Sequence, residues 1–81
     1  MKNFMDGMPR VVKVRNILYA LKKMGFKEVG GTRHYKLVDG RGRIATITRS
    51  HDEIPRGMLN IILRKEIGMS EEELKIFIQL L

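Results

Sequence analysis

Apolar residues recur at intervals of three and four between residues 11 and 24 of the chain. The positions are Val11, Val14, Ile17, Leu18, Leu21 and Met24. Residues three and four apart share one face of a helix, so this spacing predicts an amphipathic helix over the segment. Gly25 is placed to end it, because glycine readily takes the left-handed conformation common at helix C-termini.

Three short extended segments follow this helix. They cover residues 26–29, 33–38 and 43–48, and the last is rich in β-branched residues. The glycine pair at 30–31 supplies the first turn, and a loop over residues 39–42 that opens with Asp-Gly supplies the second. We expect these segments to form a three-stranded antiparallel sheet.

Two more helices are predicted at the C-terminal end. Pro55 suits the first turn of one helix, which Gly68 ends. Ser70 and Glu73 have the spacing of a capping box and begin the other. The apolar positions of the two helices are Met58, Leu59, Ile62, Leu63, Leu74, Phe77, Ile78 and Leu81.

The predicted order is therefore α-β-β-β-α-α, and the predicted class is α+β. We expect a leader over residues 1–7 and a single domain over residues 8–81. Met8 lies at the boundary, and we group its side chain with the leader methionines and not with the core. Helices before and after an antiparallel sheet favour one covered face and one open face.

The second predicted strand indicates which side chains lie on the open face. Successive side chains of a strand point to opposite faces. Tyr35 and Leu37 are large and apolar and belong under the helices, which places His34 and Lys36 together on the open face. In the third strand the alternation does not decide between the set with Ile44 and Thr46 and the set with Ala45 and Ile47.

The net charge of +7 is concentrated in the first half of the chain. Residues 10–49 contain eleven Lys or Arg and two acids, whereas residues 57–81 contain three bases and four acids. Such a field attracts polyanions and favours nucleic acid binding. The phosphate-contact candidates are Lys13, Lys22, Lys23, Arg33, Lys36, Arg41 and Arg43.

Composition excludes several other classes of protein. With 81 residues the chain has no room for a deep enclosed cofactor pocket, and we expect no cofactor. The absence of cysteine excludes disulfides and thiolate chemistry, and two histidines make no zinc site. No apolar run has the roughly 18 residues of a membrane span, and no secretory signal is evident, so we expect a cytoplasmic protein that binds neither metal nor membrane.

His34 is the first candidate for catalysis. Histidine titrates near neutral pH, so it can take a proton from a ribose 2′-hydroxyl or give one to a leaving oxygen. Arg33 and Lys36 are close enough in sequence to hold a phosphate. By spacing alone, an ordinary surface histidine is the better explanation of the residue. His51 precedes two acids, and a loop residue or helix cap is the simpler explanation for it.

Several segments resemble the HicA toxin family. They are Met-Pro-Arg at 8–10, Leu-Lys-Lys-Met-Gly-Phe at 21–26, Gly-Gly-Thr-Arg-His-Tyr at 30–35, and a tail over residues 55–70. The resemblance implies a double-stranded-RNA-binding-like fold and an mRNA interferase in which the histidine at position 34 is catalytic. It also implies a HicB-like antitoxin partner. Thr32 replaces the serine of the family motif and keeps its hydroxyl group, so it joins the RNA-contact candidates.

Three functions stay open from the sequence. The first is an endoribonuclease toxin that cleaves mRNA through His34 without a metal. The second is a non-catalytic RNA-binding module, which is weakened because the last helix begins with Ser-Glu-Glu-Glu and would repel phosphate. The third is a protein-interaction module whose basic face binds an acidic partner.

Overall fold

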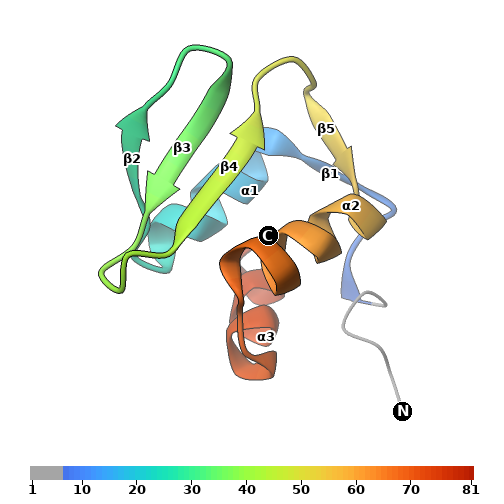
Figure 1. Ribbon diagram of the computed structural model, residues 1–81. Coiled ribbons are helices and arrows are strands. Elements are labelled where there is room, and N and C mark those ends of the chain that lie inside the picture. Colours follow the sequence, from blue (N-terminus) through green and yellow to red (C-terminus); the bar gives the residue numbers. More distant parts are fainter. Residues whose placement is uncertain (1–6) are drawn as a thin grey trace.

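The computed structural model describes residues 7–81. Strands β2 (Lys27–Gly30), β3 (His34–Val38) and β4 (Ile44–Thr48) form an antiparallel sheet in that order. Helix α1 (Val14–Lys23) lies behind this sheet (Figure 1). The arrangement confirms the predicted α+β class and is compatible with the α-β-β-β-α order of double-stranded-RNA-binding-like folds.

The C-terminal third is helical, as the sequence predicts. Helix α2 (Arg56–Ile61) runs directly into the π-helical segment η2 (Ile62–Ile67), and α3 (Glu71–Leu80) follows. Gly68 ends η2 in the left-handed conformation, with φ of 79°. The side chain of Ser70 accepts a hydrogen bond from the Glu73 amide, and the Glu73 carboxylate accepts one from the Ser70 amide, so the predicted capping box is confirmed.

A second, two-stranded sheet was not predicted. Strand β1 (Val11–Lys13) pairs with β5 (Glu53–Pro55), with Val12 opposite Ile54. The helix expected from Val11 therefore begins only at Val14, and Val11 is 46% exposed. The sequence prediction failed here because Val11 and Val14 are three residues apart. That spacing fits one helix, but it also fits a short strand that leads directly into a helix. Pro55 likewise ends β5 instead of lying within the second helix.

The core lies between α1, the C-terminal helices and one face of the sheet. Its largest fully buried side chains are Phe77, Ile17, Leu21, Leu37, Ile47, Leu59, Leu63 and Leu74. Two methionines depart from expectation. Met8, predicted to belong to the leader, is buried at 3% exposure, whereas Met58, predicted to fill the core, is 57% exposed.

The open face of the sheet carries the side chains that the alternation of β3 predicts. Leu37 is fully buried and Tyr35 packs against the core, while His34 and Lys36 are exposed. In β4, where the sequence left both faces possible, Ala45 and Ile47 are buried. Ile44 and Thr46 therefore share the open face with His34 and Lys36.

The predicted leader over residues 1–7 lies outside the described residues, apart from Gly7. Within residues 7–81, every helix is too short or too polar to cross a membrane.

Candidate functional site

His34 is the first residue of β3 and is exposed to solvent. It lies opposite Thr48 in the register of β3 and β4. The pairing continues one residue further, because the Arg49 amide donates to the Arg33 carbonyl over 3.2 Å. These residues surround an open hollow at the end of the sheet, lined by Arg33, His34, Thr48, Arg49 and Ser50.

The turn before β3 determines where His34 stands. Gly30 and Gly31 both have φ of 113°, a conformation that residues with a side chain rarely adopt. Gly31 also lies against the backbone of His34, so that a Cβ at position 31 would collide with the His34 carbonyl oxygen. Gly30 ends β2 and pairs with Lys36, so only Gly31 of the predicted glycine turn lies in the loop, where it permits a close backbone approach beneath the histidine.

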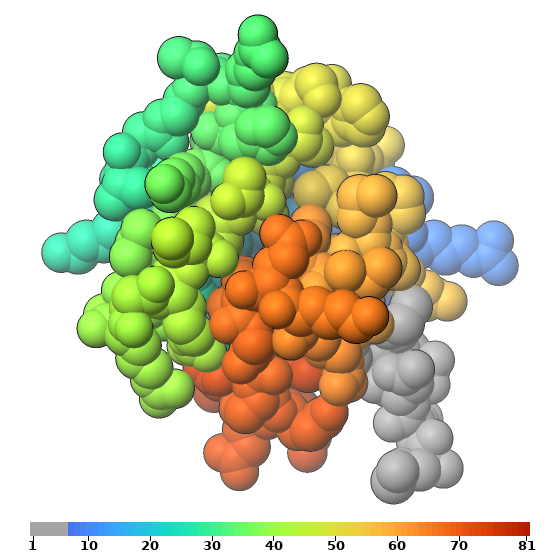
Figure 2. All heavy atoms as spheres, in the orientation of Figure 1, coloured from blue at the N-terminus to red at the C-terminus, as the bar shows by residue number. Residues whose placement is uncertain are grey.

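Lys36 lies two residues beyond His34 on the same face, opposite Thr46. This face is turned toward the viewer in Figure 2, where the side chains of β3 and β4 lie beside those of the C-terminal helical segments. Among the described residues, the side chains of His34, Arg33 and Lys36 make no hydrogen bond or ion pair. A histidine beside free cationic side chains suits proton transfer at a bound phosphodiester.

Arg49 is the residue of this site that the sequence did not single out. Its guanidinium lies over the Tyr35 ring, 4.0 Å from the centroid, and its Nη2 lies 3.6 Å from a carboxylate oxygen of Glu28. These contacts hold the guanidinium on the Tyr35 side of the sheet, opposite to the side chain of His34, although Arg49 also borders the hollow of His34 at the end of β4. Arg49 follows the last residue of β4, so its neighbours come from β2 and β3 and could be found only from the strand register.

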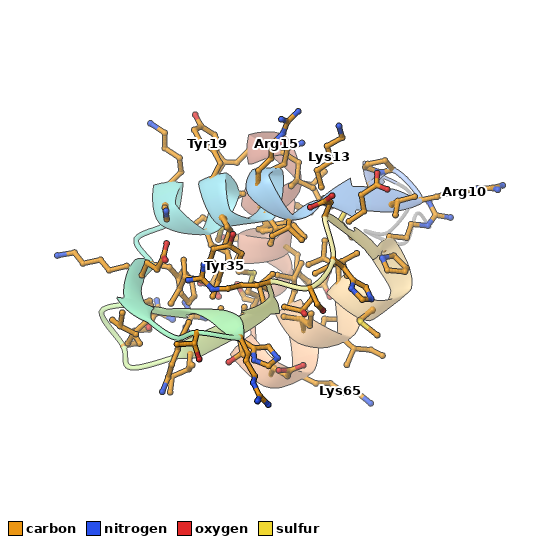
Figure 3. The ribbon with its side chains drawn as sticks, turned by 90° about the horizontal axis from the view of Figure 1, so that it is seen from above. Arg10, Lys13, Arg15, Tyr19, Tyr35 and Lys65 are labelled. Atoms are coloured by element: carbon orange, nitrogen blue, oxygen red, sulfur yellow. The ribbon has the colours of Figure 1, made fainter. Side chains whose placement is uncertain are left out.

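The basic residues of α1, and Lys13 at the end of β1, lie on the other side of the sheet from His34. In Figure 3, Lys13, Arg15 and Tyr19 project from the N-terminal half of the molecule away from the strands, whereas Lys65 projects in the opposite direction. Lys22 makes an ion pair of 3.3 Å with Glu28, and Lys23 lies over the Tyr19 ring. The structure therefore does not bring Lys13, Lys22 or Lys23 together with the histidine.

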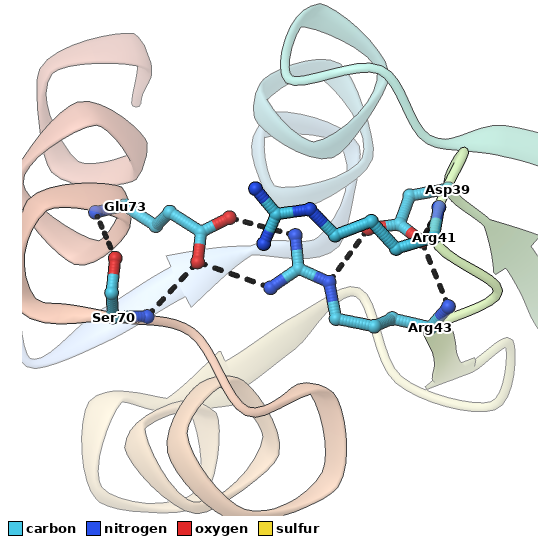
Figure 4. Close-up of polar contacts among 5 residues, drawn as sticks. All are labelled: Asp39, Arg41, Arg43, Ser70 and Glu73. Atoms are coloured by element: carbon cyan, nitrogen blue, oxygen red, sulfur yellow. Dashed lines mark hydrogen bonds and ion pairs between the residues drawn. The ribbon is translucent and has the colours of Figure 1, made fainter.

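Arg43 is also misplaced among the phosphate-contact candidates, because carboxylates already engage it. Its Nε donates to Asp39 over 2.7 Å, while Nη1 and Nη2 donate to the two carboxylate oxygens of Glu73 over 3.0 and 2.7 Å (Figure 4). The side chain is only 21% exposed. Arg43 therefore connects the β3–β4 loop to α3, and we remove it from the set of RNA contacts.

The pKa values of this network follow from its hydrogen bonds. Those from Arg43, followed by the backbone amide of Ser70, lower the pKa of Glu73 from 4.5 to about 2. Burial alone would raise the pKa of Asp39, but hydrogen bonds from the side chain and backbone of Arg43 and from the backbone of Arg41 lower it overall. Hydrogen bonds to Glu73 and Asp39 raise the pKa of Arg43. All three groups are thus held in their charged forms.

The remaining candidates lie at opposite ends of β3. Thr32 is exposed in the turn before His34, while Arg41 is exposed in the loop that joins β3 to β4, at the far end of the hairpin. His51 lies between β4 and β5, and its Nδ1 is 3.1 Å from the hydroxyl of Ser50. Within the described range, no three His, Cys, Asp or Glu side chains gather in a group that could hold a metal ion.

Comparison with protein families identifies the family of the chain. Residues 14–69 match the family described as the HicA toxin of bacterial toxin-antitoxin systems. The chain belongs to the HicA toxin family. A search of curated proteins gave no significant match. The matched range begins at the first residue of α1, ends just beyond η2 and contains the whole three-stranded sheet with His34. As a HicA domain, the chain is the toxin of a toxin–antitoxin system, and the family implies a HicB-type antitoxin as its partner.

Proposed function

We propose that this HicA protein is an endoribonuclease that cleaves mRNA, with His34 as its general acid or base. The observation that carries the proposal is the position of His34, exposed at the start of β3 in a hollow that it shares with Arg33 and Arg49. An RNA strand over this hollow would place a phosphodiester beside the imidazole of His34 and the guanidinium of Arg33, whose side chain makes no ion pair among the described residues.

The reaction that these groups suit is internal transfer. The ribose 2′-oxygen attacks the adjacent phosphorus, the bond to the 5′-oxygen of the next nucleotide breaks, and a 2′,3′-cyclic phosphate is left. His34 either removes the proton of the 2′-hydroxyl or protonates the leaving 5′-oxygen. Arg33 stabilises the negative charge that develops on the phosphoryl oxygens, and Lys36 holds a neighbouring phosphate. These steps require proton transfer and cationic stabilisation alone, so we expect cleavage to proceed without a metal ion.

The antitoxin is proposed to inhibit by covering the same face. The groups around the hollow are cationic, and a HicB-like partner with an acidic surface would be attracted to them. Such a partner would bury His34 and exclude RNA. Thr32, which lies in the turn before His34, would then contact RNA in the free toxin and the antitoxin in the complex.

The test is cleavage of a purified mRNA by the wild-type protein, with and without a chelator. His34→Ala and His34→Gln are compared with Gln79→Ala, a substitution at an exposed position of α3 far along the chain from the site. We expect cleavage by the wild type and by Gln79→Ala in chelator, with a cyclic phosphate product. We expect none by either His34 variant. RNA binding without any cleavage by the wild type would favour the binding-module alternative.

A further inference from the structure

A second hollow lies on the other side of Arg49 from His34. It is formed by the first turns of α1, by Tyr35 of β3 and by the segment that leads into β5, and its volume is about 520 Å³. That volume is within the range of ~300–1,000 Å³ typical of small-ligand sites. The lining residues are Lys13, Val14, Arg15, Leu18, Tyr35, Arg49, His51, Asp52 and Glu53.

The two hollows meet at Arg49, which lines both. Arg49 rests on the Tyr35 ring and is paired with Glu28, so its guanidinium is held between them. Figure 3 shows Tyr35 between α1 and the strands, with Lys13 and Arg15 extending beyond α1 at the outer rim. A single RNA strand that leaves His34 would therefore pass around the end of the sheet at Arg49 to enter the second hollow, whose outer rim is basic.

The lining combines apolar surface with carboxylates that lack a partner. Val14, Leu18 and Tyr35 supply the apolar part. In the part of the chain that the structure describes, the carboxylates of Asp52 and Glu53 make no hydrogen bond or ion pair. Glu53 stands opposite Lys13 in the β1–β5 register, and yet the two side chains form no ion pair. A site for phosphate alone would not carry acids, since they repel it, whereas a site for a base and its phosphate uses both charges.

We propose that this second hollow binds the unpaired nucleotide next to the cleaved bond and selects guanine there. This inference rests on the proposed ribonuclease function. The base lies on the apolar surface, Arg49 holds the phosphate between the two hollows, and a carboxylate of Asp52 or Glu53 reads the base edge. Single-stranded RNA is commonly recognised in this way, by stacking on side chains and by hydrogen bonds to the Watson–Crick edge.

Guanine follows from the chemistry of a carboxylate acceptor. An ionised carboxylate only accepts hydrogen bonds. Guanine presents two adjacent donors on its Watson–Crick edge, N1–H and the 2-amino group, and these match the two carboxylate oxygens. Adenine and cytosine offer a single amino group beside a ring acceptor that would face the carboxylate unfavourably. Uracil offers one N–H between two carbonyl groups.

The test measures binding separately from cleavage. The His34→Ala protein is titrated with hexauridylate in which one position carries guanosine, inosine or adenosine; inosine lacks only the 2-amino group of guanosine. The wild-type protein is titrated in parallel with 2′-fluoro versions, which cannot be cut because they lack the 2′-hydroxyl nucleophile. A hydrogen bond contributes about 0.5–1.5 kcal/mol, so we expect guanosine to be favoured over inosine by about threefold to tenfold. Adenosine should bind most weakly.

The variant that examines the lining is Asp52→Asn/Glu53→Gln in the same His34→Ala background. Its matched control is Glu66→Gln/Glu72→Gln, which changes the charge equally at exposed positions of η2 and α3. Both pairs should raise overall affinity for RNA, but only the first should reduce the guanosine preference below about twofold. A guanosine preference that survives the first pair, or equal binding of the three oligonucleotides, would overturn the inference while leaving the ribonuclease proposal intact. No binding of RNA by any of these proteins would overturn both.

Discussion

Neutralising Glu73 should cost the protein a substantial part of its stability, although the residue lies on the surface side of α3. In Glu73→Gln the amide keeps the capping-box acceptor for the Ser70 N–H, and glutamine is accepted at that position of the motif. The ion pair with Arg43 is lost. Since the side chains of Arg43 and Glu73 are each only 21% exposed, their charges are poorly screened by water.

The size of the effect follows from the pKa of Glu73. A fall from 4.5 to about 2 on folding corresponds to about 3–4 kcal/mol, at about 1.4 kcal/mol per pKa unit. Partial exposure and the retained hydrogen bonds reduce this, so we expect a loss of about 2 kcal/mol at pH 7. For a domain of this size, such a loss lowers the Tm by roughly 8–16 °C.

The sign of the pH dependence is fixed by the direction of the shift. A carboxyl group whose pKa is depressed in the folded state stabilises that state above its unfolded pKa. This contribution is lost as the pH falls through the folded pKa. The difference in stability between wild type and Glu73→Gln should therefore be full above about pH 5 and should vanish near pH 2.

The assay is urea unfolding followed by circular dichroism between pH 7 and pH 2. Glu72→Gln is the matched control, because it makes the same change in the same turn of α3 at an exposed position. We expect it to alter the free energy of unfolding by less than about 0.5 kcal/mol, as is usual for surface substitutions. Equal losses in the two variants, or a Glu73→Gln effect that persists undiminished at pH 2, would refute the reasoning from the Arg43 ion pair.

Three further outcomes are expected. His34→Ala should lower the cleavage rate by about 10²–10⁴ while changing RNA affinity less than about threefold, as single-turnover kinetics and titration would reveal. A plot of log affinity against log salt for single-stranded RNA should have a slope of about −0.7 per phosphate contacted, and a flat plot would contradict a phosphate-dominated interface. Gly31→Ala should reduce stability and cleavage more than Gly30→Ala, because both share φ of 113° but only Gly31 abuts the His34 carbonyl; equal losses would argue against that contact.

The parts of the fold that sequence could predict are those encoded by neighbouring residues. The alternation in β3 placed Leu37 in the core and His34 on the open face. The Ser70–Glu73 capping box and the left-handed Gly68 were also readable, since each depends on residues within a few positions of one another.

The features that sequence could not predict depend on contacts between distant segments. The pairing of β1 with β5 and the role of Arg43 both join positions at least 30 residues apart. Charge alone put Arg43 among the phosphate contacts, because nothing local shows that Glu73 occupies its guanidinium. Arg49 was overlooked for a similar reason: only the β3–β4 register brings it next to Arg33 and the hollow of His34.

The β1–β5 ribbon also has a consequence for the order in which the protein folds. Val12 and Ile54 are more than forty residues apart, and the amide of Val14, which opens α1, donates to the carbonyl of Asp52 over 2.8 Å. Contacts of such long range form late, because the chain between them must first be ordered, whereas the β3–β4 hairpin closes locally. During synthesis the hairpin that carries His34 can therefore form before α1 is anchored. A nascent chain that ends before β5 lacks this anchorage, and the toxin becomes complete only after the segment following its candidate catalytic hairpin has left the ribosome.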